Sequence, residues 1–225
     1  MNGKRPILSI IGGTGTLGTG LAMRWSAAGY PVILGSRSAE KADAAAKAIR
    51  VSPGTASVRG MDNVSAAKAG EIVVVTVPYA NHETILREIR DAVAGKIVVD
   101  ATVPLVPPKV ATVQLPPEGS AARAAQALLG DGVHVVAAFQ NVAGHKLQSP
   151  QSIDCDVLVC SNDRAARESV IALAGAAGLR GIDAGPLANA VAAEALTSIL
   201  IGINRRYKVD GAGIRITGDL VASAG

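Results

Sequence analysis

The glycine-rich run Gly13-Thr-Gly-Thr-Leu-Gly18 is the feature that most constrains the fold. The short apolar run Ile7–Ile11 precedes it, and a helical pattern follows over about residues 15–28. A G-x-G-x-x-G turn between a buried strand and a helix is typical of the first βαβ unit of a dinucleotide-binding fold. A structural turn that binds no dinucleotide has the same pattern, so both interpretations stay open here.

Strand-like and helix-like segments continue to alternate along the first two thirds of the chain. We predict further strands at 32–34, 72–77, 96–99 and 134–137, and helices at 39–49, 82–92 and 120–129. This rhythm indicates an α/β fold of Rossmann type, with a doubly wound, mostly parallel sheet. The segment 101–118 holds five prolines and is therefore expected to be an extended loop.

A polar, linker-like stretch at Gln148–Ile153 suggests a domain boundary. Beyond it we predict strands at 156–160 and 180–183, helices at 164–177 and 187–205, and a terminal strand at 211–217. The sequence thus divides into a dinucleotide-binding domain at 1–147 and a small C-terminal α/β domain at 148–225. The apolar helix at 187–205 exceeds what so small a unit can bury, so we expect a homodimer that uses this region.

Composition limits the partners and the compartment. The net charge is only +4, its cations are scattered, and aromatic residues make up 2%, which argues against nucleic-acid binding. No run has the length of a signal sequence or a membrane span, so we expect no membrane association and a cytoplasmic location. Cys155 and Cys160 lie five apart in a predicted strand, on opposite faces, which predicts neither a disulfide nor a metal site.

The residues at the end of the second strand indicate which cofactor the chain binds. An NAD enzyme needs a carboxylate there for the ribose 2′-hydroxyl, whereas this chain has Ser36, Arg37 and then Lys41. A guanidinium and a hydroxyl suit a 2′-phosphate, so NADP is favoured over NAD. The alternative is that Arg37 and Lys41 simply form the solvated start of a helix.

The sequence contains no catalytic dyad. We expect His82 to face solvent at the start of its helix, with a place near the nicotinamide as the alternative. His145 is the best histidine candidate, and Asp100 is expected to act as a structural cap. Hydride transfer between two cofactors needs ring alignment more than acid–base groups, so no catalytic residue is assigned beyond positioning.

Several longer motifs make the chain resemble the NADPH-dependent coenzyme F420 reductases, also called F420:NADP oxidoreductases. These motifs are spread over nearly the whole length: Gly12–Gly18, Gly35–Arg37, Thr76–Pro78, Val103-Pro104, Glu118–Ala121, Asp183–Asn189, Ile201–Lys208 and Gly211–Gly218. The C-terminal motifs are the most specific. The chain departs from the archaeal pattern at Tyr79, where archaeal members have Trp, and at Gln140–Gly144, where they have His-Thr-Ile-Pro-Ala.

The resemblance implies a set of binding residues for NADP and for coenzyme F420, a deazaflavin. For NADP it implies Gly13, Thr14, Gly15, Thr16, Leu17 and Gly18 at the pyrophosphate, Ser36, Arg37 and Lys41 at the 2′-phosphate, and Thr76, Val77, Val103 and Gly144 at the nicotinamide side. For the deazaflavin it implies Gln140, Asn141, Val142, Ala143 and Ala212. Ala143 and Gly144 are small, so we expect them to let two flat rings approach each other.

Two other functions stay open at this point. An NADPH-dependent reductase of a flavin or a small carbonyl compound uses the same first domain. A non-catalytic NADP-sensing module does so as well, although it needs no second cleft.

Overall fold

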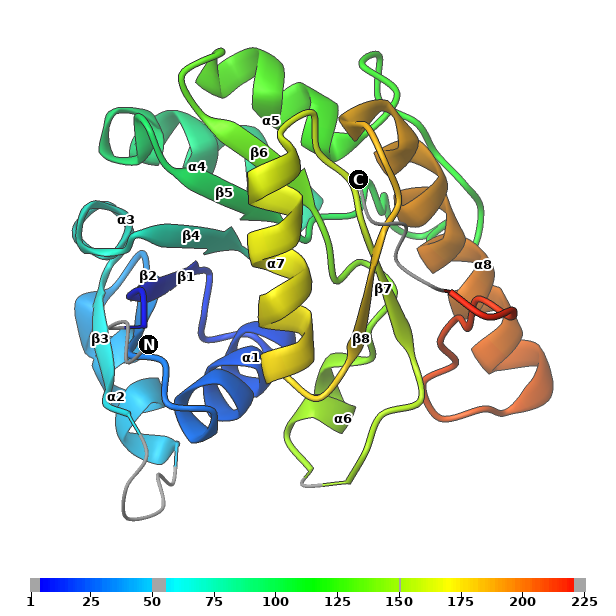
Figure 1. Cartoon of the computed structure of the whole chain (residues 1–225), viewed down its shortest axis with the longest axis horizontal. Helices are drawn as coiled ribbons and strands as arrows, with labels where there is room; N and C mark the ends of the chain where they lie inside the picture. Colours follow the sequence, from blue (N-terminus) through cyan, green and yellow to red (C-terminus); the bar gives the residue numbers. More distant parts are fainter. Residues whose placement is uncertain (1–4, 50–55, 150, 221–225) are drawn as a thin grey trace.

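A computed structural model describes residues 5–49, 56–149 and 151–220, so Pro150 of the linker-like stretch lies outside it. Six parallel strands form the main sheet in the order β3-β2-β1-β4-β5-β6 (Figure 1). This order confirms the predicted Rossmann-type, doubly wound sheet. The strands are β1 Leu8–Ile11, β2 Val32–Ser36, β3 Val58–Asp62, β4 Ile72–Val75, β5 Ile97–Asp100 and β6 His134–Ala137.

Helices cover both faces of this sheet, as right-handed crossovers require. Side chains of α1, α2 and α7 pack with one buried cluster, and those of α3, α4 and α5 pack with the other. Ser38 and Ser120 cap α2 and α5 by accepting hydrogen bonds from the backbone N–H of Lys41 and Arg123. The helices are α1 Thr16–Ala27, α2 Ala39–Ala48, α3 Asn63–Ala69, α4 His82–Ile89, α5 Ala121–Leu129, α6 Gly144–Leu147, α7 Arg164–Ala176 and α8 Ala190–Tyr207, with single 3₁₀ turns η1 Tyr79–Asn81, η2 Arg90–Val93 and η3 Leu187–Asn189.

A second, two-stranded parallel sheet follows, formed by β7 Asp156–Val159 and β8 Arg180–Asp183. An antiparallel bridge between Ala137 and Cys160 joins it to the end of β6. The predicted terminal strand at 211–217 is wrong, because this segment forms no ladder of backbone hydrogen bonds with a neighbouring strand. The backbone N–H of Asp156 donates to the Ile214 carbonyl. The backbone N–H of Ile216 then donates to the side-chain carboxylate of Asp156 at 2.6 Å, so the second hydrogen bond is not one between two backbones.

Apart from single 3₁₀ turns, three elements escaped the sequence analysis: β3, α3 and the four-residue helix α6. The strand β3 lies at the edge of the sheet and is only partly buried, so its residues lack the continuous apolar run of the inner strands. The helix α3 has seven residues, too few for a clear period.

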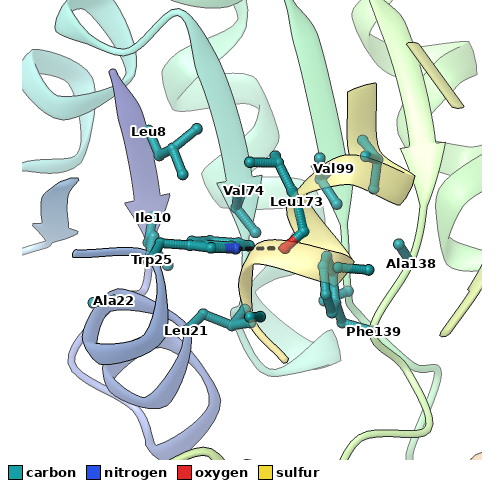
Figure 2. Packing of buried hydrophobic residues seen from close by; sticks show 14 of the residues in the cluster. Leu8, Ile10, Leu21, Ala22, Trp25, Val74, Val99, Ala138, Phe139 and Leu173 are labelled. Carbon is teal, nitrogen blue, oxygen red and sulfur yellow. Dashed lines mark hydrogen bonds between the residues drawn. The ribbon is translucent and has the colours of Figure 1, made fainter. Parts of the chain in front are cut away.

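The largest cluster of buried residues crosses the expected boundary near residue 148. Trp25 on α1 is fully buried, and its indole Nε1 donates to the carbonyl of Leu173 on α7 at 2.8 Å (Figure 2). The same ring meets Phe139 edge to face, with centroids 5.8 Å apart. Both sides of the boundary therefore share one core, and the division into two domains stays a proposal.

Among the described residues, Leu187–Tyr207 is long and apolar enough by length and composition to cross a membrane, with a hydropathy of 1.4. A third of that window, 33%, is buried inside the chain. One such helix carries little weight, because core helices of soluble proteins meet the same criterion.

We predict that Trp25→Ala lowers the free energy of unfolding by about 3–5 kcal/mol, since it leaves a cavity between α1 and α7. Urea unfolding followed by circular dichroism measures the change. Val113→Ala, at a position that is 40% exposed, is the control and is expected to shift stability by less than about 0.5 kcal/mol. A loss of under about 1 kcal/mol for Trp25→Ala would contradict the shared core.

Candidate functional site

A cavity of about 750 Å³ opens at the carboxyl ends of β2, β1, β4 and β5. Ligands of open α/β sheets bind at this edge, where the strand order reverses. Eight of the residues expected to bind NADP line it: Thr14, Gly15, Leu17, Ser36, Arg37, Thr76, Val77 and Val103.

The three glycines of the turn after β1 meet different surroundings. A Cβ atom on Gly13 would lie 2.6 Å from the Ile10 carbonyl oxygen, and one on Gly18 would lie 2.7 Å from Gly13 Cα. Neither position tolerates a side chain, so these two glycines allow the tight turn and the close packing of α1. A Cβ on Gly15 would meet nothing nearer than the Gly12 carbonyl oxygen at 3.6 Å, which leaves the space beside this cavity-lining residue open to a ligand.

The helix α1 begins directly at this turn. Gly15 is its N-cap and supplies no side-chain hydrogen bond, and the first turn contains no acidic residue. The start of the helix therefore has free N–H groups and the positive end of the helix dipole on the cavity side. No carboxylate of the first turn neutralises them, and this arrangement suits a pyrophosphate.

Cationic and hydroxyl groups lie at the β2 end of the cavity. Ser36 and the exposed Arg37 are among its lining residues, whereas Lys41 lies outside the lining, on the first turn of α2. The nearby carboxylate of Glu40 accepts from the Ser38 hydroxyl at 2.6 Å. A guanidinium therefore borders the place where the sheet geometry puts the adenosine ribose.

Two buried polar atoms in the cavity wall have no hydrogen-bond partner among the described residues. They are Asn63 Oδ1, on a residue 1% exposed, and Thr102 Oγ1, on a residue 3% exposed. Both oxygens are themselves shielded from solvent, so they are unsatisfied atoms behind the cavity surface rather than contacts offered to a ligand. The open glycine turn, in contrast, fits the pyrophosphate of a dinucleotide.

A buried group of ionisable side chains lies behind the β4–β5 end of the cavity. His82 Nε2 lies 2.6 Å from Asp100 Oδ2, and the His82 ring stacks on Tyr79, with centroids 6.2 Å apart. Desolvation lowers the pKa of His82, but the carboxylates of Asp100, Glu194 and Glu83 together outweigh it, so the pKa is raised. Glu194 on α8 accepts from the N–H groups of Ala121 and Ala122, and burial raises its pKa to about 7.

The expectation that His82 faces solvent is therefore wrong, since the residue is 3% exposed. The signal was in the sequence: His82, Ile85, Leu86 and Ile89 follow the i, i+3, i+4, i+7 spacing of one helix face, and all four are buried. Glu194 was missed because nothing in its helical surroundings marks a buried carboxylate.

Comparisons with known proteins agree with this geometry. A family described as "NADP oxidoreductase coenzyme F420-dependent" matches residues 7–104. The F420-dependent NADP reductase of Methanocaldococcus jannaschii is 41% identical over 219 residues, covering 93% of this chain and 97% of that protein. This chain belongs to the F420-dependent NADP reductase family.

Two further members extend the comparison. The F420-dependent NADP reductase of Methanothermobacter thermautotrophicus is 42% identical over 218 residues, with 93% of this chain and 94% of that protein covered. A crystal structure of a candidate F420-dependent NADP reductase from Arthrobacter sp. FB24 superposes with a TM-score of 0.77 at 25% identity, covering 95% of this chain and 99% of that one. The match to the F420-dependent NADP reductase family thus includes the C-terminal part of the chain.

The five residues expected at the deazaflavin lie outside the lining of the main cavity. Gln140 and Asn141 are buried and donate through their amides to the carbonyls of Asp100 and Ala193. Asn141 and Ala143 instead line a second cavity of about 380 Å³, together with His145, Lys146, Asp154, Cys155, Asp210 and Gly211. The backbone N–H of Ala212 donates to Asn204 Oδ1, and His145 Nε2 lies 2.9 Å from Asp210 Oδ1. In this member of the F420-dependent NADP reductase family, two of the five residues predicted at the deazaflavin thus line a hollow separate from the main cavity, and Gln140, Val142 and Ala212 line neither.

Gly144 is small for a reason that the sequence analysis did not foresee. A Cβ atom on Gly144 would lie 2.8 Å from the backbone nitrogen of Leu17 and 2.9 Å from its Cα. The glycine thus lets α6 press against the first turn of α1, while its expected role beside the two rings stays a prediction.

We predict that Gly144→Ala lowers the free energy of unfolding by about 1–3 kcal/mol and weakens NADPH binding, because the added methyl group displaces the backbone that carries the pyrophosphate turn. Gly132→Ala is the matched control, since a Cβ there meets nothing within 4 Å. Thermal unfolding and a nucleotide titration compare the two variants. Equal stability and equal affinity in both would show that the Leu17 contact is not tight.

Proposed function

We propose that the chain transfers hydride between NADP(H) and coenzyme F420; its relatives are named F420-dependent NADP reductases. The single observation that carries this is the cavity that runs from Arg37, past the open face of Gly15, to Thr76 and Val103. Its polarity changes along its length in the order that NADP requires: cation, helix N-terminus, then small and apolar side chains.

In this proposal Gly13, Gly15 and Gly18 shape the pyrophosphate site, and Thr14, Thr16 and Leu17 border it. Ser36, Arg37 and Lys41 hold the 2′-phosphate, while Thr76, Val77 and Val103 hold the nicotinamide ribose. When bound, the two cofactors supply the hydride donor and the hydride acceptor. The protein binds them and aligns the rings, and the one proton that F420 takes up beside the hydride comes from solvent, so no side chain has to exchange it.

We propose that the deazaflavin approaches from the side of Gln140–Ala143 and Ala212. Leu17 lines the main cavity and Gly144 lies directly against it, whereas Ala143 lines the second cavity. The two hollows therefore adjoin across this contact. Lys146 places an ammonium group in the second one, beside the carboxylates of Asp154 and Asp210, so Lys146 is the residue there that suits an anionic tail on the second substrate.

Replacing Arg37 tests the nucleotide assignment. We predict that Arg37→Glu weakens binding of NADPH by roughly 2–4 kcal/mol and of NADH far less, because the change removes charge-assisted bonds to the 2′-phosphate and adds repulsion. Titrations with both nucleotides are run beside a deazaflavin absorbance assay with NADPH and F420.

The matched control is Arg123→Glu, on α5 and outside the lining of the main cavity. Equal losses for NADPH and NADH in Arg37→Glu would contradict the 2′-phosphate site. A wild-type protein that binds NADPH and does not reduce F420 would instead favour a flavin reductase or a sensing module.

We also propose a cytoplasmic homodimer that uses α8, with no nucleic-acid or membrane partner. Its apolar side chains remain partly uncovered in the single chain, with Ile199 48% exposed. A helix with so apolar a composition is stable in water when a second copy covers it. Light scattering at micromolar concentration is predicted to give twice the mass of one chain, and Ile199→Lys is predicted to give a monomer. A monomeric wild-type protein would contradict the proposal.

A further inference from the structure

The segment that follows α8, residues 210–216, forms one wall of the second cavity and is here called the strap. Its two glycines, Gly211 and Gly213, are among the residues that line this cavity. A Cβ atom on Gly211 would lie 2.6 Å from Ala143 Cβ, and one on Gly213 would lie 2.8 Å from Cys155 Sγ. Because the strap touches the neighbouring walls at both points, any displacement of it changes the shape of the cavity.

One side-chain pair holds the end of the strap in place. The fully buried carboxylate of Asp156, at the start of β7, accepts from the backbone N–H of Ile216 at 2.6 Å. Arg180, at the start of β8, donates to both oxygens of this carboxylate, at 2.7 and 2.6 Å, and also to the Ile216 carbonyl at 2.8 Å. The Asp156 N–H donates to the Ile214 carbonyl as well. Neither Asp156 nor Arg180 belongs to the described residues that line the cavity, so the pair acts on it through the strap alone.

The chemistry of this pair makes it a firm anchor. The Arg180 guanidinium holds the pKa of the Asp156 carboxyl below its usual range, so the carboxylate is charged at neutral pH. Charge-assisted bonds to both carboxylate oxygens are strong and fix the orientation of both groups. A lysine would neutralise the charge equally well, but it lacks the rigid fork that serves the carboxylate and the Ile216 carbonyl together.

The beginning of the strap is held more loosely. The backbone N–H of Ala212 donates to Asn204 Oδ1 at 2.8 Å, and Asp210 Oδ1 lies 2.9 Å from His145 Nε2. The side chains of His145 and Asp210 are 51% and 87% exposed, so water screens their contact. The buried Asp156 therefore determines where the strap lies.

We propose that Asp156 and Arg180 are positioning residues for the second substrate, which act through the strap. Lys146 is the residue in the second cavity that suits an anionic tail, and a Cβ atom on Gly211 would lie 3.0 Å from Lys146 Cε. A strap that shifts thus displaces both the wall and this ammonium group, while the main cavity keeps its shape. The inference rests on the proposed function, because it takes F420 as the second substrate.

Arg180→Lys tests this role, because it keeps a cation beside Asp156 and loses the bond to the Ile216 carbonyl. We expect oxidised F420 to bind about three- to tenfold more weakly in a titration, the effect of roughly one hydrogen bond. The Kd of NADPH, and kcat with both substrates saturating, are expected to stay within about twofold of the wild type, since only binding of the second substrate is weakened. In the ligand-free variant the Ile216 amide is expected to exchange faster with deuterium, because the strap opens more often.

Arg167→Lys is the matched control. Arg167 also binds a carboxylate of the small sheet, Asp183, at 2.9 Å, and also donates to a backbone carbonyl, that of Ser161, so neither of these partners belongs to the strap. This variant is expected to lower the melting temperature as Arg180→Lys does, and to leave F420 binding and exchange at Ile216 unchanged. Arg180→Met, which removes the cation from Asp156, is expected to change both more than Arg180→Lys does.

Unchanged F420 binding in Arg180→Lys would overturn the proposal, and so would an equal loss in Arg167→Lys. Unchanged exchange at Ile216 would show that Arg180 does not hold the strap and would overturn it as well. A wild-type protein that binds F420 without reducing it would contradict the proposed function, while the titrations would still decide the role of Arg180. A wild-type protein that does not bind F420 would overturn both.

Discussion

The close contact between backbone segments at the turn after β1 is the constraint on which the rest of the structure depends. Gly18 lies against Gly13, and Gly144 lies against Leu17, at distances that no side chain allows. These contacts bring α1 and α6 against the same turn, and residues of this turn line the main cavity. The missing side chains of Gly13, Gly18 and Gly144 therefore shape the binding edge.

Polar groups around the cavity divide into those that hold the protein together and those left unused. Asp100, Gln140 and Asn141 are buried and use their side chains on neighbouring loops and on α8. Within the part of the chain that the structure describes, Thr102 and Asn63 each keep one side-chain oxygen without a hydrogen-bond partner. Asp100 holds both the loop at Thr102 and the His82 ring, so a site that needs no acid–base catalysis still depends on buried ionisable residues.

The sequence predicted the parts of the fold that repeat a simple period. The apolar runs of β1 and β4 and the glycine turn identified the Rossmann-type sheet, and Ser36 and Arg37 lie at the cavity as expected. The edge strand β3 and the partner of His82 were missed, because edge strands lack a strong apolar pattern and a pairing across 18 residues leaves no local trace. The role of Gly144 depends on a contact with a residue more than a hundred positions away, which spacing alone does not reveal.

Trp25 has a practical consequence beyond packing. It is the one tryptophan of the chain, it is fully buried, and it lies on the helix that begins at the pyrophosphate turn. Its fluorescence therefore comes from a single, dry environment close to the binding edge. Because indole emission overlaps the absorption of reduced nicotinamide, energy transfer from this ring gives an optical signal for NADPH occupancy that needs no label and no second substrate.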